Sequence, residues 1–312
     1  RSETIARAAL PNSAQTLAAI GYVQRRQGQV AQSIVELEKA SRLDPRNSLI
    51  LREIAASLTM LRRYDEAETM YARSLAVFPN DTEARGQRAI VQMMRGDTAS
   101  ASAMLASVLA DNDPQGTISL VRFRLQMLLR KPDAAIGVLA HAPDWLMSRF
   151  EHSVVPVTSL RAQALAMRGD AAAAHTQYLL AEGQLRALLD NPVTANDASS
   201  HLGIVYAGLG RMQEALAAAR SAAVQISLSR DPMVGAFNLE RLARTEAQVG
   251  ETSSAIEHLR QLLDAPAGSV VAVPILRIDP AWDTIRNDPG FQALLKKYAN
   301  AEPNAAAGTT HE

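Results

Sequence analysis

The chain has 312 residues, with 32 Lys plus Arg against 32 Asp plus Glu, and it contains no cysteine. The balanced charge excludes a bulk electrostatic attraction to nucleic acid or to an anionic membrane, and the missing cysteines exclude disulfides and cysteine-bound metals. Apolar residues make up 47% of the chain but aromatic residues only 4%, which favours close-packed helices over sheets. No uncharged apolar run reaches the ~20 residues that a membrane span needs.

From about residue 14 the chain repeats itself every 34 residues. The positions expected to form a turn between two paired helices are Gly28, Arg62, Gly96 and Arg130. Five residues after each of these turn markers stands a small side chain, which allows two helices to cross closely. These four small residues are Ser33, Ala67, Ala101 and Ala135. Pro45 and Pro79 follow second helices that they cannot continue.

The second half keeps the pattern at a longer spacing, with turn markers at Gly169, Gly210 and Gly250. Glycine accepts the left-handed conformation that ends a helix, so we expect that conformation at these turns. The extra residues are expected in a longer connection over 143–154 and in one extended second helix over 171–190. Counted in this way, about seven repeats occupy residues 14–267.

After residue 267 the pattern changes. Residues 270–283 are expected to be extended and broken by proline, and Asp288 with Pro289 predicts the start of a final helix. Because the last repeat of a stacked array leaves an apolar face uncovered, residues 268–298 are predicted to form a cap. We expect Trp282 and Phe291 to be buried against the seventh repeat. Residues 299–312 are predicted to be a disordered tail.

The 34-residue pattern resembles the tetratricopeptide repeat family over roughly four-fifths of the chain. The resemblance implies an all-α fold: a right-handed α-solenoid of stacked helix–turn–helix repeats with a C-terminal capping segment. Residues 1–13 then correspond to the tail of a truncated preceding repeat. Arg62 and Arg130 stand where the family prefers glycine, and Arg88 interrupts an otherwise apolar first helix.

The carboxyl end is similar to the ending of certain bacterial multidomain signalling proteins. The similar residues are 276–283, Leu-Arg-Ile-Asp-Pro-Ala-Trp-Asp, and 288–295, Asp-Pro-Gly-Phe-Gln-Ala-Leu-Leu. In such proteins the repeats follow a winged-helix CadC/ToxR-like regulator domain, a protein kinase or an adenylate cyclase, often with a TolB-like segment. The resemblance implies the regulatory or sensory half of a larger protein. It favours the cytoplasm, or the periplasm if the parent has a transmembrane helix.

Motifs for chemistry are absent from the sequence. The six histidines are scattered singly, without the spacing of a metal site. Asp197, Ser200 and His201 share one helix start, where a cap and surface positions explain them, and the nucleophile-elbow pattern is missing. We therefore predict no catalytic residue, no metal, no cofactor and no enzyme activity.

What remains is a binding surface. The first helices of stacked repeats line a concave groove, so we predict a non-enzymatic scaffold that binds a peptide or partner domain there and binds no nucleic acid. Arginines can grip carboxylates and methionines adapt to apolar partners; the arginines are expected to be exposed and to contribute little to stability. The groove candidates are Tyr22, Arg25, Arg52, Ile90, Met93, Arg124 and Met127. The alternatives are that the Met and Ile side chains pack between repeats, that the chain is a free-standing adaptor or assembly factor, or that it is an enzyme or a small-molecule-binding module. The partner and the oligomeric state are left open.

Overall fold

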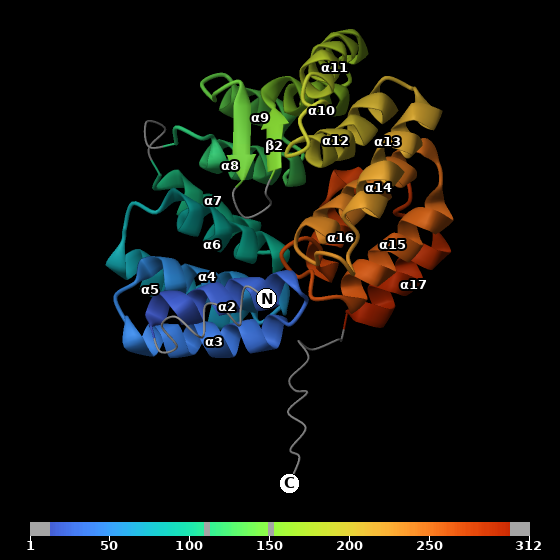
Figure 1. Ribbon diagram of the computed structural model, residues 1–312. Helices are drawn as coiled ribbons and strands as arrows, with labels where there is room; N and C mark the ends of the chain where they lie inside the picture. The colour runs from blue at the N-terminus through green and yellow to red at the C-terminus, as the bar shows by residue number, and fades with distance from the viewer. Residues whose placement is uncertain (1–12, 109–112, 149–152, 300–312) are drawn as a thin grey trace.

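The computed structural model describes residues 13–108, 113–148 and 153–299, and these fold into an all-α solenoid of paired helices (Figure 1). The first helices of the pairs are α2 (Ala14–Arg26), α4 (Ser48–Met60), α6 (Thr82–Met94), α8 (Thr117–Leu128), α10 (Val157–Arg168), α12 (Ala195–Gly208) and α14 (Val234–Val249). The second helices are α3 (Val30–Leu43), α5 (Tyr64–Val77), α7 (Thr98–Ala106), α9 (Pro132–Leu139), α11 (Ala171–Arg186), α13 (Met212–Gln225) and α15 (Thr252–Asp264).

The turn between the two helices of each pair has the conformation that the sequence predicts. All seven turn markers have a positive φ, including 61° at Arg62 and 55° at Arg130. The small residues five positions later are also where close packing requires them. They are each at most 3% exposed: Ser33, Ala67, Ala101, Ala135, Ala174, Ala215 and Ala255. A larger side chain at these points would hold the paired helices apart.

Capping side chains follow the same period in the first three repeats. Ser13, Asn47 and Asp81 each precede a first helix and accept a hydrogen bond from the backbone N–H three residues later. Such a bond satisfies one of the donors that a helix start leaves unpaired. The starts of these three first helices are therefore encoded locally.

One predicted connection and one predicted helix differ in the structure. The segment over 143–156 contains two antiparallel strands, β1 (Trp145–Ser148) and β2 (Ser153–Pro156), which we name the hairpin. Contacts distant in sequence hold it: the Met147 N–H donates to the Gln115 carbonyl at 2.9 Å, and the Thr117 hydroxyl donates to the Met147 carbonyl at 2.9 Å. The expected helix over 171–190 ends at Arg186, and the Leu188 carbonyl accepts from the Thr194 hydroxyl instead of from a further helical turn.

The carboxyl end forms a cap, with more helix than predicted. Instead of an extended stretch, residues 270–283 include α16 (Val273–Ile278) and a 3₁₀ turn, η2 (Pro280–Trp282). The helix α17 (Pro289–Tyr298) follows, with Asp288 as its cap, as predicted. Trp282 and Phe291 are 1% and 0% exposed in one cluster with residues of α14 and α15, so their expected burial against the seventh repeat is confirmed. The two predicted tails, apart from Ser13 and Ala299, lie outside the described residues.

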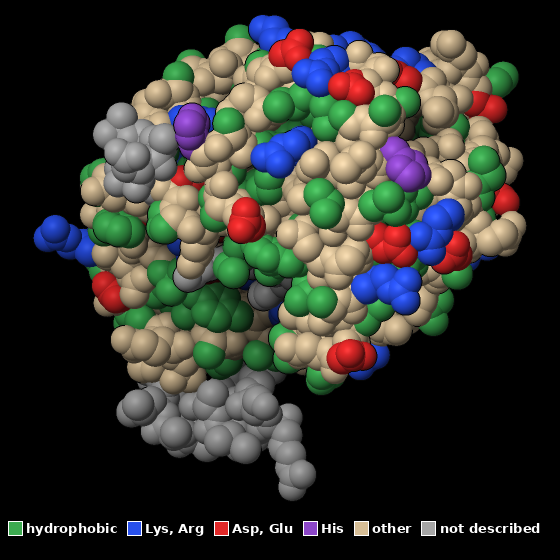
Figure 2. Space-filling model, turned by 90° about the horizontal axis from the view of Figure 1, so that it is seen from above, with side chains coloured by type: hydrophobic (Ala, Val, Ile, Leu, Met, Phe, Trp, Pro, Cys, Tyr) green, Lys and Arg blue, Asp and Glu red, His purple; other side chains and the backbone are tan. Residues whose placement is uncertain are grey.

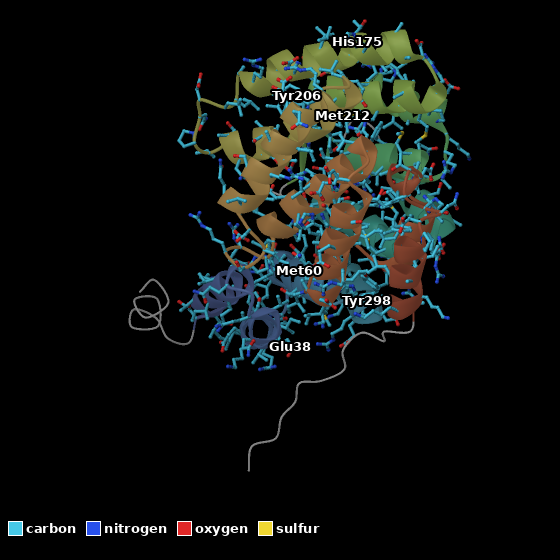
Figure 3. The ribbon with its side chains drawn as sticks, turned by 90° about the vertical axis from the view of Figure 1, so that its right-hand side faces the viewer. Glu38, Met60, His175, Tyr206, Met212 and Tyr298 are labelled. Carbon is cyan, nitrogen blue, oxygen red and sulfur yellow. The ribbon has the colours of Figure 1, made fainter. Side chains whose placement is uncertain are left out.

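The path of the helices curves until the carboxyl-terminal helices lie beside the first repeats (Figure 1). In Figure 3, Met60 at the end of α4 lies where the N-terminal helices meet the C-terminal ones. Most of the residues that make this contact belong to a stretch that we name the closing segment, residues 265–286, which joins α15 to α17 and includes α16 and η2. A solenoid whose two ends touch in this way was not predicted.

Candidate functional site

The groove arginines of the first two repeats are paired. Arg25 on α2 contacts the Glu53 carboxylate on α4 at 2.5 Å, and Arg52 on α4 contacts Asp81 at 2.8 Å. Arg25 is only 6% exposed, and the Arg52 side chain is 19% exposed. The expectation that the groove arginines are exposed is therefore wrong for these two. Each belongs to an inter-repeat ion pair, and removing it would leave a buried or half-buried carboxylate without its cation.

Tyr22 lies beside this chain of ion pairs. The Arg25 guanidinium is 5.9 Å from the centre of the Tyr22 ring, within the range of a cation–π contact. Burial, together with the Glu53 carboxylate, raises the pKa of Tyr22 to about 12. The phenol therefore stays neutral at any physiological pH, as a hydrogen-bonding and stacking group.

The apolar groove candidates of the third repeat are covered by the chain itself. Ile90 and Met93 are 6% and 2% exposed, in one cluster with Ala272 and Ile275 of the closing segment. They pack between repeats, which is the alternative given above for the Met and Ile candidates. They also contact the closing segment, which is more than 170 residues away in the sequence. Arg124 and Met127, on α8, are half-buried. The seven candidates thus lie on first helices, where the closing segment already covers Ile90 and Met93.

Arg88, the unusual charge on α6, also has a partner. Its guanidinium contacts the Glu68 carboxylate of α5 at 2.5 Å. The residue therefore pairs with the preceding repeat and does not face an apolar neighbour unpaired.

The turn markers of repeats one to four meet the returning chain in order. Asp231, just before α14, pairs with Arg26, and a Cβ at the adjacent Gly28 would lie 3.5 Å from Pro232. A Cβ at Gly96 would lie 3.1 Å from the Cβ of Pro274. Together with Arg62 and Arg130, described next, four successive turns contact progressively later parts of the carboxyl-terminal chain.

The two arginine markers make the direct bonds of this contact. The Arg62 guanidinium donates to the carbonyls of Ala265 at 2.8 Å and Leu262 at 2.9 Å. Arg130 forms a bidentate pair with Asp283, at 2.6 and 2.7 Å. The two positions at which the sequence departs from glycine are therefore those whose side chains bind the closing segment and the adjoining end of α15.

A buried polar cluster joins the hairpin to α12 and α14. The Ser153 hydroxyl lies 2.9 Å from His201 Nε2 and 3.3 Å from the Asp197 carboxylate, and it accepts from Arg241 at 3.0 Å. His201 and Ser200 are 7% and 1% exposed, so the expected surface positions are wrong.

The cluster is not arranged for nucleophilic catalysis. Asp197 approaches the same ring nitrogen as the serine, at 3.5 Å, whereas a catalytic relay places the carboxylate on the opposite nitrogen. The charged Arg241 donor further lowers the nucleophilicity of the Ser153 oxygen. The geometry fits the anchoring of the hairpin onto two first helices.

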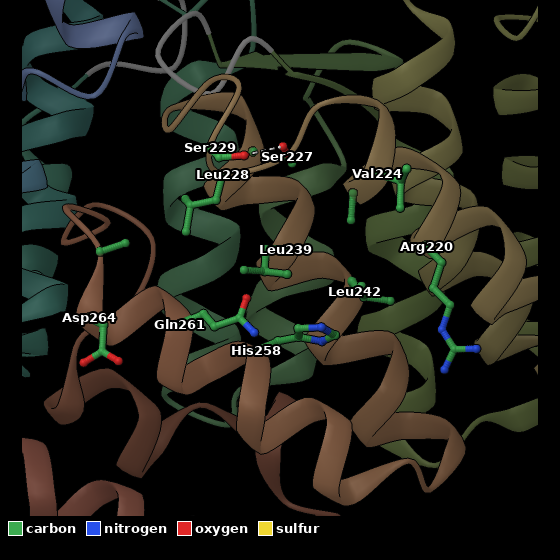
Figure 4. Close-up of a pocket in the computed structure, with 13 residues that line it drawn as sticks. Arg220, Val224, Ser227, Leu228, Ser229, Leu239, Leu242, His258, Gln261 and Asp264 are labelled. Atoms are coloured by element: carbon green, nitrogen blue, oxygen red, sulfur yellow. Dashed lines mark hydrogen bonds between the residues drawn. The ribbon is translucent and has the colours of Figure 1, made fainter.

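A cavity of about 830 Å³ opens on the second-helix side of the last two repeats (Figure 4). The α14 side chains Leu239 and Leu242 line it between α13 and α15, with Arg220 at one end. Beside that end, the buried Glu246 carboxylate contacts His258 at 2.7 Å and lies 3.8 Å from Arg220. A mostly apolar cavity of this size is large enough for a small ligand or a few side chains of a partner.

Other kinds of site find no support in the described ranges. Within residues 13–108, 113–148 and 153–299, no three His, Asp or Glu side chains gather where they could hold a metal ion. In the same ranges, no helix has both the length and the apolar character to cross a membrane. On the face shown in Figure 2, positive and negative side chains are interspersed, so that face has no continuous basic patch.

Sequence comparison settles the family. Two profiles, both described as tetratricopeptide repeat, match the chain, one at residues 60–117 and 166–230 and the other at residues 14–47. Together they cover just over half of the chain. The chain belongs to the tetratricopeptide repeat family. Proteins of this family generally mediate protein–protein interaction or assembly. A search of curated proteins found no match to this tetratricopeptide repeat protein.

Solved structures of other repeat proteins are similar to it. They include PilW, a widely conserved type IV pilus biogenesis factor (15% identity, 80% of this chain and 92% of that chain, TM-score 0.36). They also include a tetratricopeptide repeat protein from Parabacteroides merdae ATCC 43184 (15% identity, 92% and 99%, TM-score 0.47). The Cut9–Hcn1 hetero-tetramer of APC/C matches at 16% identity and TM-score 0.51, over 96% of this chain and 58% of that chain. At this identity the last likeness shows a shared fold.

Proposed function

We propose that this tetratricopeptide repeat protein is a non-enzymatic scaffold that binds a peptide or a partner domain in the concave groove of its first helices. The observation that carries the proposal is that the C-terminal ends of two first helices, α4 and α6, already pack against a segment of the chain itself. Residues 265–278 lie against α4 and α6, held by a hydrogen bond from the Arg62 guanidinium to the Ala265 carbonyl and by apolar contacts at Ile90 and Met93. A surface that binds an internal segment has the shape and the donors to bind an external one.

The groove candidates then have different roles. Ile90 and Met93 supply the apolar surface, and Arg124 and Met127 extend the groove to the fourth repeat. Arg25 and Arg52 hold neighbouring first helices in position through Glu53 and Asp81, with Tyr22 packed beside them. Arg25 and Arg52 therefore shape the groove and do not grip the partner directly.

A finer proposal concerns the parent protein. The similarity of residues 276–283 and 288–295 to bacterial multidomain signalling proteins supports a regulatory or sensory half of a larger protein. The alternative is a free-standing adaptor. The genomic coding sequence upstream of Arg1 decides between them, because only the first proposal requires a signalling domain to be encoded there.

The outer cavity between α13 and α15 is a second candidate for the interaction site. Its leucine floor and its arginine at one end suit an amphipathic segment that carries a carboxylate. Val224 on its wall is 79% exposed, so a change there alters the cavity without removing a buried contact.

Photocrosslinking in the source cell tests these surfaces against each other. A photoreactive amino acid is placed at Met127 in the groove, at Val224 on the cavity wall, or at the exposed Glu38 of α3 as a control. A partner crosslinked from Met127 but not from Glu38 supports the groove. Crosslinking from Val224 alone assigns binding to the outer cavity. Equal crosslinking from all three positions contradicts both assignments.

A further inference from the structure

The backbone at the second turn marker is strained, and the strain coincides with a contact. Arg62 has a φ of 61°, a region that residues with a Cβ rarely occupy. The equivalent turns of repeats one, three, five, six and seven carry glycine. Glycine at this position would relieve the backbone, but it would remove the guanidinium that reaches Ala265 and Leu262. Strained residues of this kind concentrate at functional sites.

The contacts around Arg62 are made to main-chain atoms. Besides the Arg62 bonds, the Tyr64 hydroxyl donates to the Gly268 carbonyl at 2.8 Å, and the Gly268 N–H donates to the Met60 carbonyl at 2.9 Å. Hydrogen bonds to backbone groups bind a peptide without reading its side chains. The bonds at the turn over 60–64 therefore recognise a backbone, and the side chains of the segment matter there only through the space that they need.

One position of the bound segment must be glycine. A Cβ at Gly268 would lie 2.4 Å from the Thr59 carbonyl oxygen and 2.5 Å from Arg62 Cγ. The first of these atoms belongs to the backbone of α4 and cannot move aside. Gly268 is not among the described glycines with positive φ, so its substitution acts through this contact alone. Further along, Ala272 and Ile275, four and seven residues after the glycine, meet the apolar cluster of Ile90 and Met93.

The bound segment offers Arg62 no carboxylate, so it binds this guanidinium less strongly than a charged acceptor would. Arg62 donates to uncharged carbonyls, that of Ala265 in the segment and that of Leu262 just before it. Burial lowers the pKa of Arg62, which means that closure costs the guanidinium part of its hydration. Opening also leaves the helix stacking intact, because each repeat of a solenoid contacts mainly its neighbours. Separation of the seventh repeat and its cap from repeats one to four would therefore break the contacts between the turn markers and the returning chain and leave the pairing of neighbouring repeats in place.

We propose that the turn over 60–64 and the apolar face of α6 form a peptide site, that residues 265–278 occupy it as an internal ligand, and that a partner protein displaces them. The partner presents a glycine followed by small and branched apolar residues four and seven positions later, as Gly268, Ala272 and Ile275 do. This inference rests on the proposed scaffold function and adds to it the chemistry of the partner and its competition with the chain's own segment.

Binding of a synthetic peptide tests the site. The probe is a fluorescein-labelled peptide of residues 262–279, added to the full chain carrying Gly268→Val, in which the internal segment cannot dock. We expect saturable binding, at least roughly tenfold tighter than to the unmodified chain, whose tethered segment competes at a high effective concentration. A peptide that itself carries Gly268→Val should not bind, and adding Arg62→Gly to the chain should weaken binding of the native peptide. Equal binding of both peptides, or no binding to the Gly268→Val chain while its helicity is unchanged, overturns the proposal.

A second measurement covers a Gly268→Val chain that fails to fold. In the Arg62→Gly chain, whose turn gains the residue that its φ favours, amide hydrogens over 265–278 should exchange faster than in the unmodified chain. Those of α5 should keep their rates. Unchanged exchange over 265–278 contradicts the site. A concentration-dependent dimer that Gly268→Val abolishes would instead assign the site to a second copy of this chain, against a partner protein. If Met127 crosslinks a partner but the peptide does not bind, the scaffold function stands and this inference fails.

Discussion

Replacement of Arg62 separates backbone strain from side-chain binding. In Arg62→Ala, the two short bonds from a charged donor to the Leu262 and Ala265 carbonyls are lost, and such bonds contribute about 1.5–3 kcal/mol each. Regained hydration of the opened surface offsets part of this loss, so we expect Arg62→Ala to destabilise the chain by about 2–3 kcal/mol. In Arg62→Gly the same bonds are lost, but relief of the left-handed backbone returns roughly 1–2 kcal/mol. The glycine variant should therefore be about 1 kcal/mol more stable than the alanine variant.

The order is the reverse of that in a helix interior, where glycine is less stable than alanine by roughly 0.5–1 kcal/mol. Urea unfolding followed by circular dichroism and by tryptophan fluorescence measures both variants. Arg63→Ala is the matched control: Arg63 pairs with Glu66 on the surface, and such pairs contribute about 0–1 kcal/mol. An alanine variant as stable as the glycine variant would refute the strain argument. Two variants as stable as the unmodified chain would show that closure contributes nothing.

Three further predictions concern packing and pH. Ala67→Leu or Ala215→Leu should destabilise by about 1–3 kcal/mol, measured by thermal unfolding, because both residues are 0% exposed at helix crossings. Trp282→Ala should cost about 3–5 kcal/mol, with amide exchange increased first in α14 and α15, against which this side chain packs. The hydrogen bond from Arg130 lowers the pKa of Asp283 below its ordinary 3.8. The Asp283 carboxylate therefore stabilises the fold at pH values above 3.8, and this stabilisation is lost as the pH falls through the lower pKa of the folded state. When the unfolding midpoint is measured against pH, the unmodified chain should show this loss and Asp283→Asn should not.

The repeat architecture is readable from sequence because it depends on local requirements. A turn marker followed five residues later by a small side chain specifies a helix, a left-handed turn and a close crossing, whatever lies elsewhere. This is why the positive φ of the turn glycines, the burial of residues such as Ala67 and the cap at Asp288 are all as predicted. The burial of Trp282 follows from the same reasoning, because an uncovered last repeat needs an apolar cover.

The candidate site was less accessible to sequence reasoning. Register placed Arg25 and Arg52 correctly on first helices, but whether an arginine faces solvent or a carboxylate depends on the neighbouring repeat. Glu53 and Asp81 lie 28 and 29 residues later, and the structure brings them within an ion-pair distance. The one available signal was the departure from glycine at Arg62 and Arg130. An arginine at a position that favours glycine indicates that its side chain makes a stabilising contact, but the sequence does not show which residue it contacts.

The amino-acid sequence alone determined the helix pairs, their turns, the crossings and the cap, because each rests on contacts within a repeat or between neighbours. Only the tertiary structure decided how far the stack curves, since small rotations at every crossing add up along the chain. That accumulated curvature brings Gly268 to the carbonyl of Met60, more than 200 positions apart. It also buries Ile90 and Met93 beneath the closing segment. A groove that is empty in a straight array of repeats is thereby filled by the chain's own end.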